Sequence, residues 1–566
     1  MKKILLLLLL IPYLGFSQNK YPKDYFRNPL GIPLILSGTF GELRSNHFHS
    51  GLDIKTQGRE GLKVFAVAEG YVSRIKVQQY GYGKAIYITH PNGYTSVYGH
   101  LSKFSDEIEA YVKEIQYKKE NYETGNLFPK KDKFVLNKGD IIAFSGDTGG
   151  SGGPHLHFEI RNTKTENVIN PMFFGIDIPD SKAPTIQSLQ VYPLSLDARI
   201  NQQHNSFKIS VKNIGNGKYA AKRISANGKI GFGINVFDRL NKAINKNGIY
   251  SLEMLVNGKR HYYHDVETFS FAESKYLNLL IDYEYFKKYK SRIQKTFKVA
   301  KNKLSIYEDL VDNGVLNIKN GLSYSVEIIT KDYKGNSSSV KIPIIGKESN
   351  AIFKKQKDTT GYKVISTKFN KFTEKNITVA FPKNTFYEDI FLDFKVDKNI
   401  AKIHNPGVPL DKSFTLTFNV SNYSEKEKEQ LYIANVEYSK YPRYVNTRKK
   451  DSTFYTTTKT LGKYGLVSDN QKPKANMLYI KNNQWISKSK TLKVKISDIG
   501  SGIKNWRATL DNQWILMQYN HKRKILTYNF NDKKLIGSKH IFKIVVSDNV
   551  GNTSERSLTF FKKQTK

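Results

Sequence analysis

The chain has 566 residues, a formal net charge of +40 and no cysteine. The absence of cysteine excludes disulfides, thiolate nucleophiles and cysteine-bound zinc, so any metal must be held by His and carboxylate side chains. The length suits roughly three to five domains of about 150 residues each. Residues 18–178 are nearly balanced, with 20 Lys and Arg against 17 Asp and Glu, so almost all of the excess positive charge lies in residues 179–566.

Residues 1–17 have the pattern of a secretory signal peptide. Lys2 and Lys3 precede the unbroken apolar run Ile4–Ile11, and small residues follow before a cleavage site ahead of Gln18. The apolar run is well short of the roughly 20 residues that a spanning helix needs, which favours a cleaved leader over a retained anchor. We therefore expect an exported protein of the periplasm, cell envelope or medium, with no transmembrane segment in the mature chain.

Residues 18–178 are predicted to form a β-rich domain, because short β-type runs alternate with Gly and Asn turns. The predicted strands are Lys63–Ala68, Gly70–Val77, Ala85–Thr89, Thr95–Tyr98, Gly139–Ser145 and His155–Arg161. The polar stretch Ser105–Tyr122 has apolar residues at helical spacing. We interpret about 105–133 as a helical insertion that lies outside the core, at the rim of a groove.

The remainder of the chain is predicted to be β-rich throughout, with an internal repeat. Three landmarks recur in the same order: an Asp-x-x-x-Pro sequence, a strand ending in Asp, and a strand followed by Asp-x-x-Gly-Asn. They predict two related Ig-like β-sandwiches at 179–348 and 469–566, with extra residues around 255–320 in the first copy. A β-rich domain of different pattern is predicted between them, at 349–468. The overall fold class is thus mainly β.

The landmark aspartates are Asp180, Asp238 and Asp332 in the first copy, and Asp469, Asp498 and Asp548 in the second. The Asp-x-x-Gly-Asn turns could bind calcium. Asp and Asn are ordinary turn formers, however, so we interpret these sequences as turn structure.

Histidine is concentrated near the start of the chain, where six of the twelve histidines precede residue 160. Four of them, His49, His100, His155 and His157, lie with Asp53 in short windows rich in glycine. His155 and His157 are two apart in a β-type run, so both side chains point to one face of the strand. One Asp and two His can supply three ligands to zinc and leave a fourth position to water, while two histidines remain for proton transfer.

Three other features nearby have simpler interpretations. His90 precedes a turn and is interpreted as a surface histidine, and His47 is a weaker candidate ligand than His49. The Gly-rich run Ser145–Gly153 lacks the Gly-Lys-Ser/Thr ending of a phosphate loop and leads into a strand, not a helix. We interpret it as a loop that delivers His155.

Four motifs carry a family resemblance: Asn46–Asp53, Tyr98–Ser102, Ser145–Gly149 and Gly153–Glu159. In this order they resemble the motifs of the lysostaphin-type (LytM-like) zinc metallo-endopeptidases, over about residues 30–175. The resemblance implies an antiparallel LytM-like peptidase domain at 18–178. It also implies one Zn²⁺ per chain, bound by His49, Asp53 and His157, with His100 and His155 flanking the metal-bound water. Its implied substrates are peptide bonds in peptidoglycan stem peptides or cross-links.

On this interpretation zinc-bound water is the nucleophile, His155 is the general base, and His100 stabilises the oxyanion or protonates the leaving amine. The two histidines could exchange roles. Two alternatives stay open, since some relatives are catalytically latent scaffolds or activators of other wall hydrolases, and a glycine-rich protein could be the substrate. The insertion makes the chain between His100 and Gly139 longer than the compact family pattern.

The segment Tyr283–Lys303 is the densest mixture of aromatic and basic residues. It predicts a contact with anionic envelope polymers, whereas nucleic acid is not an expected partner of an exported protein. The competing interpretation is a solvated basic surface whose aromatic rings pack inward.

Overall fold

A computed structural model describes residues 20–348, 360–438 and 440–563. The predicted leader, residues 1–17, lies outside this range. The chain is mainly β with largely antiparallel sheets, as the sequence predicted, and its buried apolar residues form four large cores. Among the described residues, no helix has the length and apolar character needed to cross a membrane.

The N-terminal unit is built on one long sheet with strand order β1-β2-β11-β6-β5-β4-β8, and a small sheet β3-β10-β7 covers part of it. Its elements are β1 (Leu36–Gly38), β2 (Leu52–Lys55), β3 (Lys63–Phe65), β4 (Gly70–Val77), β5 (Lys84–Thr89), β6 (Tyr94–Leu101), β7 (Lys103–Phe104), α1 (Asp106–Lys119), β8 (Gly125–Leu127), β9 (Val135–Leu136), β10 (Ile141–Phe144), β11 (His155–Asn162), β12 (Val168–Ile169) and the 3₁₀ turn η1 (Pro171–Phe174). Leu156 and Phe158 of β11 are fully buried, so this strand turns its alternate residues into the core.

Helix α1 forms where the sequence predicted a helix, but its expected position outside the core is wrong. Ile108 and Val112 are buried in the main core of the N-terminal unit. The chain then returns through β8 and β9, both of which pair with β4 at the sheet edge. The 105–133 segment is therefore part of the domain, because its apolar stripe completes the core.

The first accessory unit is a mixed arrangement around a second core. Its strands are β13 (Thr185–Pro193), β14 (Arg199–Ile200), β15 (Phe207–Ile209), β16 (Val211–Gly215), β17 (Lys218–Ala221), β18 (Ile224–Phe237), β19 (Ser251–Val256), β20 (Lys259–Asp265), β21 (Thr268–Phe269), β22 (Gln294–Lys295), β23 (Tyr307–Leu310), β24 (Leu316–Ile318), β25 (Ser323–Lys331) and β26 (Ser337–Gly346), with the 3₁₀ turns η2 (Ser274–Tyr276) and η3 (Asp312–Gly314) and the helices α2 (Leu277–Leu280) and α3 (Tyr283–Tyr289).

Part of this accessory unit packs against the N-terminal unit. Strand β21 pairs with β12 and so extends the N-terminal sheet. Leu277, Leu280 and Ile281 of the helical segment are fully buried in the N-terminal core. The extra residues predicted around 255–320 in the first repeat thus connect the first accessory unit to the N-terminal unit.

The second accessory unit surrounds a third core. Its elements are β27 (Lys363–Val364), β28 (Asn370–Glu374), β29 (Ile377–Phe381), β30 (Ile390–Phe391), β31 (Phe394–Asp397), β32 (Ile400–Ile403), β33 (Phe414–Asn419), α4 (Glu425–Gln430), β34 (Leu431–Asn435), β35 (Arg443–Tyr444), β36 (Arg448–Lys450), β37 (Thr453–Thr458) and β38 (Gly462–Ser468). Its two larger sheets have the orders β28-β29-β33-β37-β36 and β31-β32-β38-β34-β35.

The last unit places two sheets around the fourth core. Its elements are β39 (Lys474–Leu478), β40 (Gln484–Trp485), β41 (Thr491–Ser497), β42 (Ile503–Leu510), β43 (Gln513–Trp514), β44 (Gln518–Asn520), β45 (Ile525–Asn529), the 3₁₀ turn η4 (Phe530–Asp532), β46 (Lys539–Asp548) and β47 (Thr553–Phe561).

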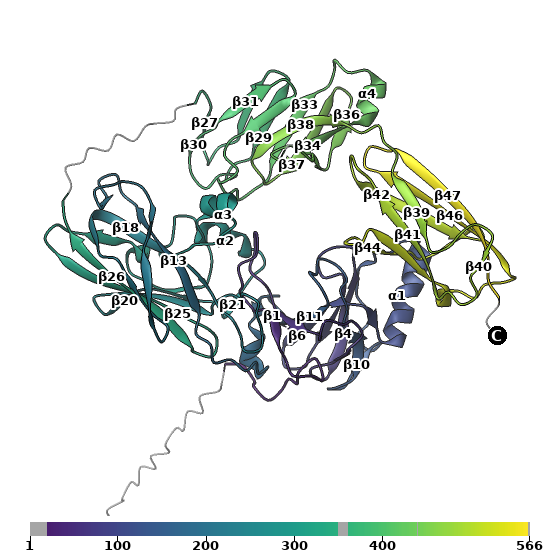
Figure 1. The fold of residues 1–566 in the computed structure, drawn as a ribbon, viewed down its shortest axis with the longest axis horizontal. Coiled ribbons are helices and arrows are strands. Elements are labelled where there is room, and N and C mark those ends of the chain that lie inside the picture. Colours follow the sequence, from purple (N-terminus) through teal and green to yellow (C-terminus); the bar gives the residue numbers. More distant parts are fainter. Residues whose placement is uncertain (1–19, 349–359, 439, 564–566) are drawn as a thin grey trace, which may run out of the picture.

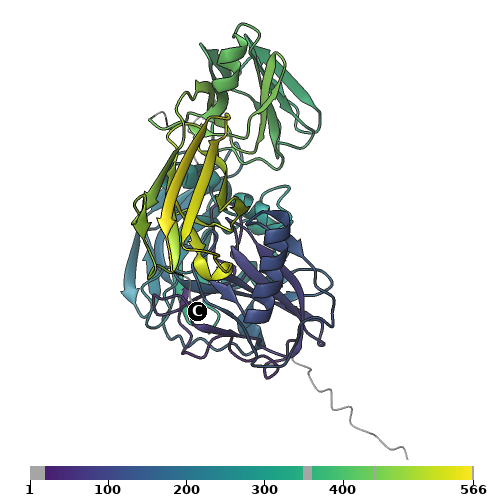
Figure 2. The same cartoon turned by 90° about the vertical axis from the view of Figure 1, so that its right-hand side faces the viewer.

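The four units follow one another around a ring, and the last unit returns to α1 of the first (Figures 1 and 2). The rings of Tyr117 on α1 and Trp514 meet edge to face at 5.3 Å. Beside them Lys113 pairs with Asp532 at 2.6 Å. The closing contact therefore has an aromatic centre and a charged rim.

Replacing Trp514 by alanine should open the ring. A tryptophan at the centre of an interface commonly contributes about 2 kcal/mol to the stability of that interface. Its loss would therefore raise the population of molecules with an open ring about 30-fold. Small-angle scattering of the purified chain should show a larger radius of gyration. Trp485→Ala is the matched control, because Trp485 is 56% exposed on the same unit. Equal radii for both variants would contradict the closing role of Trp514.

Candidate active site

The site is built on the pairing of two neighbouring strands. In the antiparallel register of β2 and β11, Asp53 lies directly opposite His157. His49 is in the loop that enters β2, where a Cβ on Gly51 would lie 2.3 Å from the carbonyl oxygen of Phe158. Glycine between His49 and Asp53 thus lets the loop approach β11 closely enough for all three side chains to meet.

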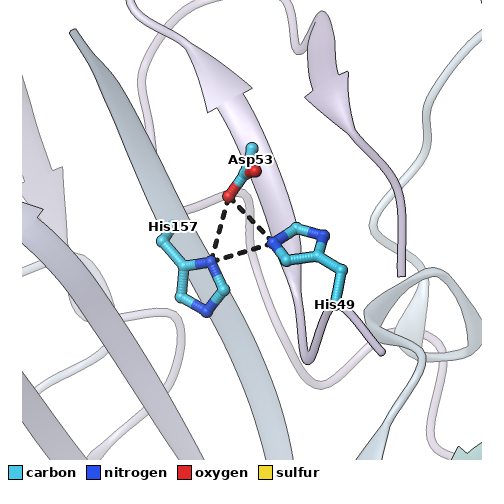
Figure 3. Close-up of side chains that lie close together, drawn as sticks. All are labelled: His49, Asp53 and His157. Atoms are coloured by element: carbon cyan, nitrogen blue, oxygen red, sulfur yellow. Dashed lines mark hydrogen bonds and ion pairs between the residues drawn. The ribbon is translucent and has the colours of Figure 1, made fainter. Parts of the chain in front are cut away.

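Three candidate ligand atoms converge at this point (Figure 3). His49 Nε2 and His157 Nδ1 each lie 3.0 Å from Asp53 Oδ1, and the two nitrogens are 3.2 Å apart. All three residues are buried. Two imidazole nitrogens and one carboxylate oxygen are the donor set of a catalytic zinc site that keeps a position open.

The outer partners of these side chains turn unprotonated atoms toward the centre. His49 Nδ1 donates to the carbonyl oxygen of Thr39 at 2.7 Å, and His157 Nε2 donates to Glu159 Oε1 at 2.8 Å. Arg44 Nη2 donates to Asp53 Oδ2 at 2.9 Å, which leaves Oδ1 for the centre. Such contacts fix the tautomer and orientation of metal ligands, so the residues present fit a bound cation.

His100 and His155 lie side by side next to this group, with ring centroids 4.7 Å apart. His155 Nε2 is 3.4 Å from Asp53 Oδ1. His100 Nδ1 donates to the carbonyl oxygen of Thr148, and His155 Nδ1 to that of Gly153, both at 2.8 Å. The loop interpreted as delivering His155 therefore orients both rings and leaves each Nε2 as an acceptor. His100 also has φ +60°, a strained conformation of the kind that clusters at functional sites.

Burial and neighbouring charge set the protonation of the group. Burial lowers the pKa of His49, and burial with the adjacent His157 and His155 lowers the pKa of His100 to about 3. Both rings are therefore neutral at pH 7. Burial alone would raise the pKa of Asp53, but His49 and the neighbouring rings of His155 and His157 hold it well below its usual range. Burial would lower the pKa of His157 as well, but its contacts with Asp53 and Glu159 outweigh burial and raise that pKa to about 9. The site thus combines an ionised carboxylate with neutral imidazoles at His49 and His100 and a more basic imidazole at His157.

A buried carboxylate that the sequence reasoning did not assign lies behind His157. Glu159 is fully buried and accepts hydrogen bonds at 2.5 Å from Ser50 Oγ and Tyr82 OH, besides that from His157. Arg161 Nε donates to its other oxygen at 2.7 Å. The sequence held a signal for Glu159, which is two residues after His157 and so points to the same face of the strand. No motif or spacing around Tyr82 in the sequence indicated that it would contact the site.

His47 and His90, which were not expected to form part of the site, have different environments. His47 is exposed and stays outside the group. The prediction of a surface position for His90 is wrong, because it is 3% exposed and bonds the carbonyl oxygen of Glu69 and the hydroxyl of Ser96. Its role is to tie two turns together within the domain.

Comparison with known proteins agrees with the motif pattern. Residues 47–117 match the family described as "Peptidase family M23". The N-terminal unit is a domain of peptidase family M23. Residues 362–469 match a "Zu5-like domain", which corresponds to the second accessory unit.

Curated relatives match this chain over about a quarter of its length. The chain is 31% identical over 138 residues to the DD-carboxypeptidase/endopeptidase Mpg of Neisseria meningitidis, covering 24% of this chain and 25% of that protein. It is 35% identical over 145 residues to a metalloprotease of Haemophilus influenzae, covering 25% of each. The chain thus spans about a quarter of the length of the curated relatives it matches.

Solved structures also align with about a quarter of the chain. The catalytic domain of EnpA from Enterococcus faecalis aligns at 22% identity and a TM-score of 0.20, covering 26% of this chain and 98% of that one. The lysostaphin catalytic domain of Staphylococcus simulans aligns at 24% identity and a TM-score of 0.19, covering 25% and 90%.

Replacing Glu159 by glutamine should weaken Zn²⁺ binding by the M23 domain about 10- to 100-fold, because the amide is a poorer acceptor for His157. Competition with a chromophoric chelator measures the affinity. Glu166→Gln is the matched control, since Glu166 also pairs with Arg161 but is partly exposed and does not contact His157. Equal losses in the two variants would assign the effect to Arg161 and not to orientation of His157.

Proposed function

We propose that the M23 domain is a zinc-dependent endopeptidase that hydrolyses peptide bonds in peptidoglycan stem peptides or cross-links. The observation that carries the proposal is the convergence of His49, Asp53 and His157 on one point, with the acceptor nitrogens of His100 and His155 beside it. His49, Asp53 and His157 would hold one Zn²⁺. Three ligands and two uncommitted histidines match the needs of hydrolysis.

When bound, zinc acts as a Lewis acid that activates water and polarises the scissile carbonyl. The protein supplies the proton transfers. His155 Nε2 is an acceptor close to Asp53, whose negative charge stabilises the imidazolium that forms when His155 takes a proton. His100 is strongly desolvated and holds a proton poorly, so it is better suited to orient the attacking water or the substrate. We therefore assign His155 as general base and His100 as its positioning neighbour.

The substrate class rests on the relatives. One is named a DD-carboxypeptidase/endopeptidase, and another is the antimicrobial peptidase lysostaphin. The proposal places the mature protein outside the cytoplasmic membrane, where such a substrate lies. This location agrees with the leader pattern of residues 1–17.

A latent scaffold or activator of other wall hydrolases is the second candidate function. Two accessory units contact segments that form the site. Lys522 of the last unit pairs with Asp147 at 2.5 Å, in the loop that orients His100 and His155. Arg292 Nε donates to the carbonyl oxygen of Arg44 at 3.1 Å on the other side. These contacts would restrict access to the site while the ring stays closed.

Digestion of purified peptidoglycan, read by mass spectrometry, tests the proposal. The zinc-loaded mature chain should release fragments cut at a peptide bond, and a chelator should abolish the reaction until Zn²⁺ is restored. His155→Ala should lower the rate at least about 100-fold, because proton transfer is lost. His47→Ala is the matched control, since this neighbouring ring is exposed and outside the group.

Two other outcomes would decide differently. Zn²⁺ bound without cleavage by the wild type, with cleavage appearing in Trp514→Ala, would support a latent enzyme held by the closed ring. Cleavage that survives in His155→Ala would remove this residue from the role of general base.

For the basic region we propose a contact with anionic envelope polymers. In the described segment Tyr283–Lys303, Phe286 and Phe297 are buried, and Tyr289 is the one aromatic ring that is exposed, at 54%. Lys288 and Lys290 are exposed and remain available to a polymer. The proposal therefore rests on charge and not on aromatic stacking.

Changing Lys288 and Lys290 together to glutamine should reduce the amount of protein that sediments with anionic wall polymer. It should also make that amount less dependent on salt concentration, because salt screens the attraction between exposed charges. The control changes Lys375 and Lys398 to glutamine, which removes the same charge from the second accessory unit. Equal binding by both variants would show that only overall charge matters.

A further inference from the structure

Three aspartates from separate segments meet where the M23 domain joins the first accessory unit. Asp180 precedes β13, Asp238 follows β18 and Asp332 follows β25. One carboxylate oxygen of each lies within 4.8 Å of the others. These are the landmark aspartates of the first repeat, and the sequence alone led us to interpret the Asp-x-x-Gly-Asn sequence that contains Asp332 as turn structure.

The buried member of the group has an oxygen with nothing to bond. Asp238 is 1% exposed, and its Oδ1 has no hydrogen-bond partner among the described residues. Oδ2 of Asp180 is likewise buried and has no hydrogen-bond partner among the residues that the structure describes. A buried polar atom in this state costs free energy unless a ligand satisfies it.

Among the described residues, no basic side chain forms an ion pair with any of the three carboxylates. Lys331 and Arg239, which adjoin Asp332 and Asp238 in sequence, are exposed. Lys182 Nζ donates to the carbonyl oxygen of Leu240, and Lys334 pairs with Asp177. Burial, together with the charges of Asp180 and Asp332, raises the pKa of Asp238 to about 7. Three gathered carboxylates without a counter-charge are unstable together, whereas a cation between them would remove the repulsion.

The turn bonds of the motif leave room for such a cation. Asn336 donates its backbone N–H to Asp332 Oδ1 at 2.9 Å and its side-chain amide to Oδ2 at 2.7 Å. The Asp-x-x-Gly-Asn sequence is thus a turn, as interpreted, but each bonded carboxylate oxygen keeps a second lone pair. The turn holds Asp332 toward the group without using up its capacity as a ligand.

The second repeat provides an internal comparison, because Asp469, Asp498 and Asp548 form a similar cluster. There, backbone N–H groups bond both oxygens of Asp469 and one oxygen of Asp548. Asp498, the counterpart of Asp238, also has one buried oxygen, Oδ1, without a partner among the described residues, but the residue as a whole is only partly buried. The two clusters therefore differ in burial, because the residue with the unpartnered oxygen is 1% exposed in the first cluster and partly exposed in the second.

The cluster opens into a small cavity whose wall is shared by two units. Phe40 and Met172 of the M23 domain line it together with the three aspartates. Gly248 N donates to Thr39 Oγ1 at 3.2 Å, and Thr39 is the residue whose carbonyl oxygen orients His49. A ligand at the cluster would hold three chain segments at the joint that supports the M23 site.

We propose that Asp180, Asp238 and Asp332 form a calcium site at this joint. Oxygen donors alone, contributed by separate loops, suit the flexible coordination of Ca²⁺ and not the nitrogen-rich preference of zinc. The site is distinct from the His49, Asp53 and His157 group and does not depend on the proposed peptidase activity. We expect a dissociation constant on the order of 0.1–1 mM, as in extracellular calcium modules.

Binding of radioactive Ca²⁺ in equilibrium dialysis, with the full mature chain saturated with Zn²⁺, tests the site directly. Wild type should bind Ca²⁺, and its unfolding temperature should rise by about 2–4 °C or more at 10 mM Ca²⁺. Asp238→Asn should lose both responses. Without Ca²⁺ this variant should be at least as stable as wild type, because the amide removes like-charge repulsion. The stability of the variant without Ca²⁺ distinguishes the loss of a metal-binding carboxylate from misfolding of the protein.

Asp498→Asn is the matched control, and it should keep the binding and the thermal shift that Asp238→Asn loses. Wild type without any Ca²⁺-dependent binding or shift would overturn the proposal. So would a response that Asp238→Asn retains in full. A response lost in Asp498→Asn and kept in Asp238→Asn would also overturn it, by placing the site in the last unit.

Discussion

The antiparallel register between β2 and β11 is the constraint on which the site depends. It sets Asp53 opposite His157, and a shift by one residue would turn one of them to the other face of the sheet. Gly51 permits the close approach of the preceding loop, which adds His49 to the pair. Arg44 and Glu159 in turn contact the Asp53 and His157 side chains that these two strands bring together.

Accessory units are integrated with the M23 domain and are not merely tethered to it. Strand β21 continues the peptidase sheet, and the helical segment after it fills part of the peptidase core. On the opposite side α1 receives the last unit through Tyr117 and Trp514. The two units that make these contacts also reach segments that form the site, through Lys522 and Arg292.

Two buried carboxylates illustrate different solutions to one electrostatic problem. Glu159 is fully buried, but Arg161 and three further donors satisfy it, so it stays ionised and orients His157. Asp238 is equally buried and keeps an oxygen without a partner beside two further carboxylates. The first arrangement is complete within the protein, whereas the second gains stability from a cation.

The sequence by itself determined the mainly β fold, the motif set and the five residues gathered at the site, because strand alternation places His155 and His157 on one face and glycines mark the turns. It predicted helix α1 but misjudged its burial, and it missed the buried position of His90. Local periodicity indicates which face of an element is apolar, but it does not indicate which other part of the protein packs against that face.

Only the tertiary structure decided the rest. The strand register, the carbonyls of Thr39 and Thr148 that fix the histidine tautomers, the Glu159 network and the meeting of Asp180, Asp238 and Asp332 are contacts between distant segments. Such contacts depend on how whole strands and units pack, and no short pattern in the chain encodes them.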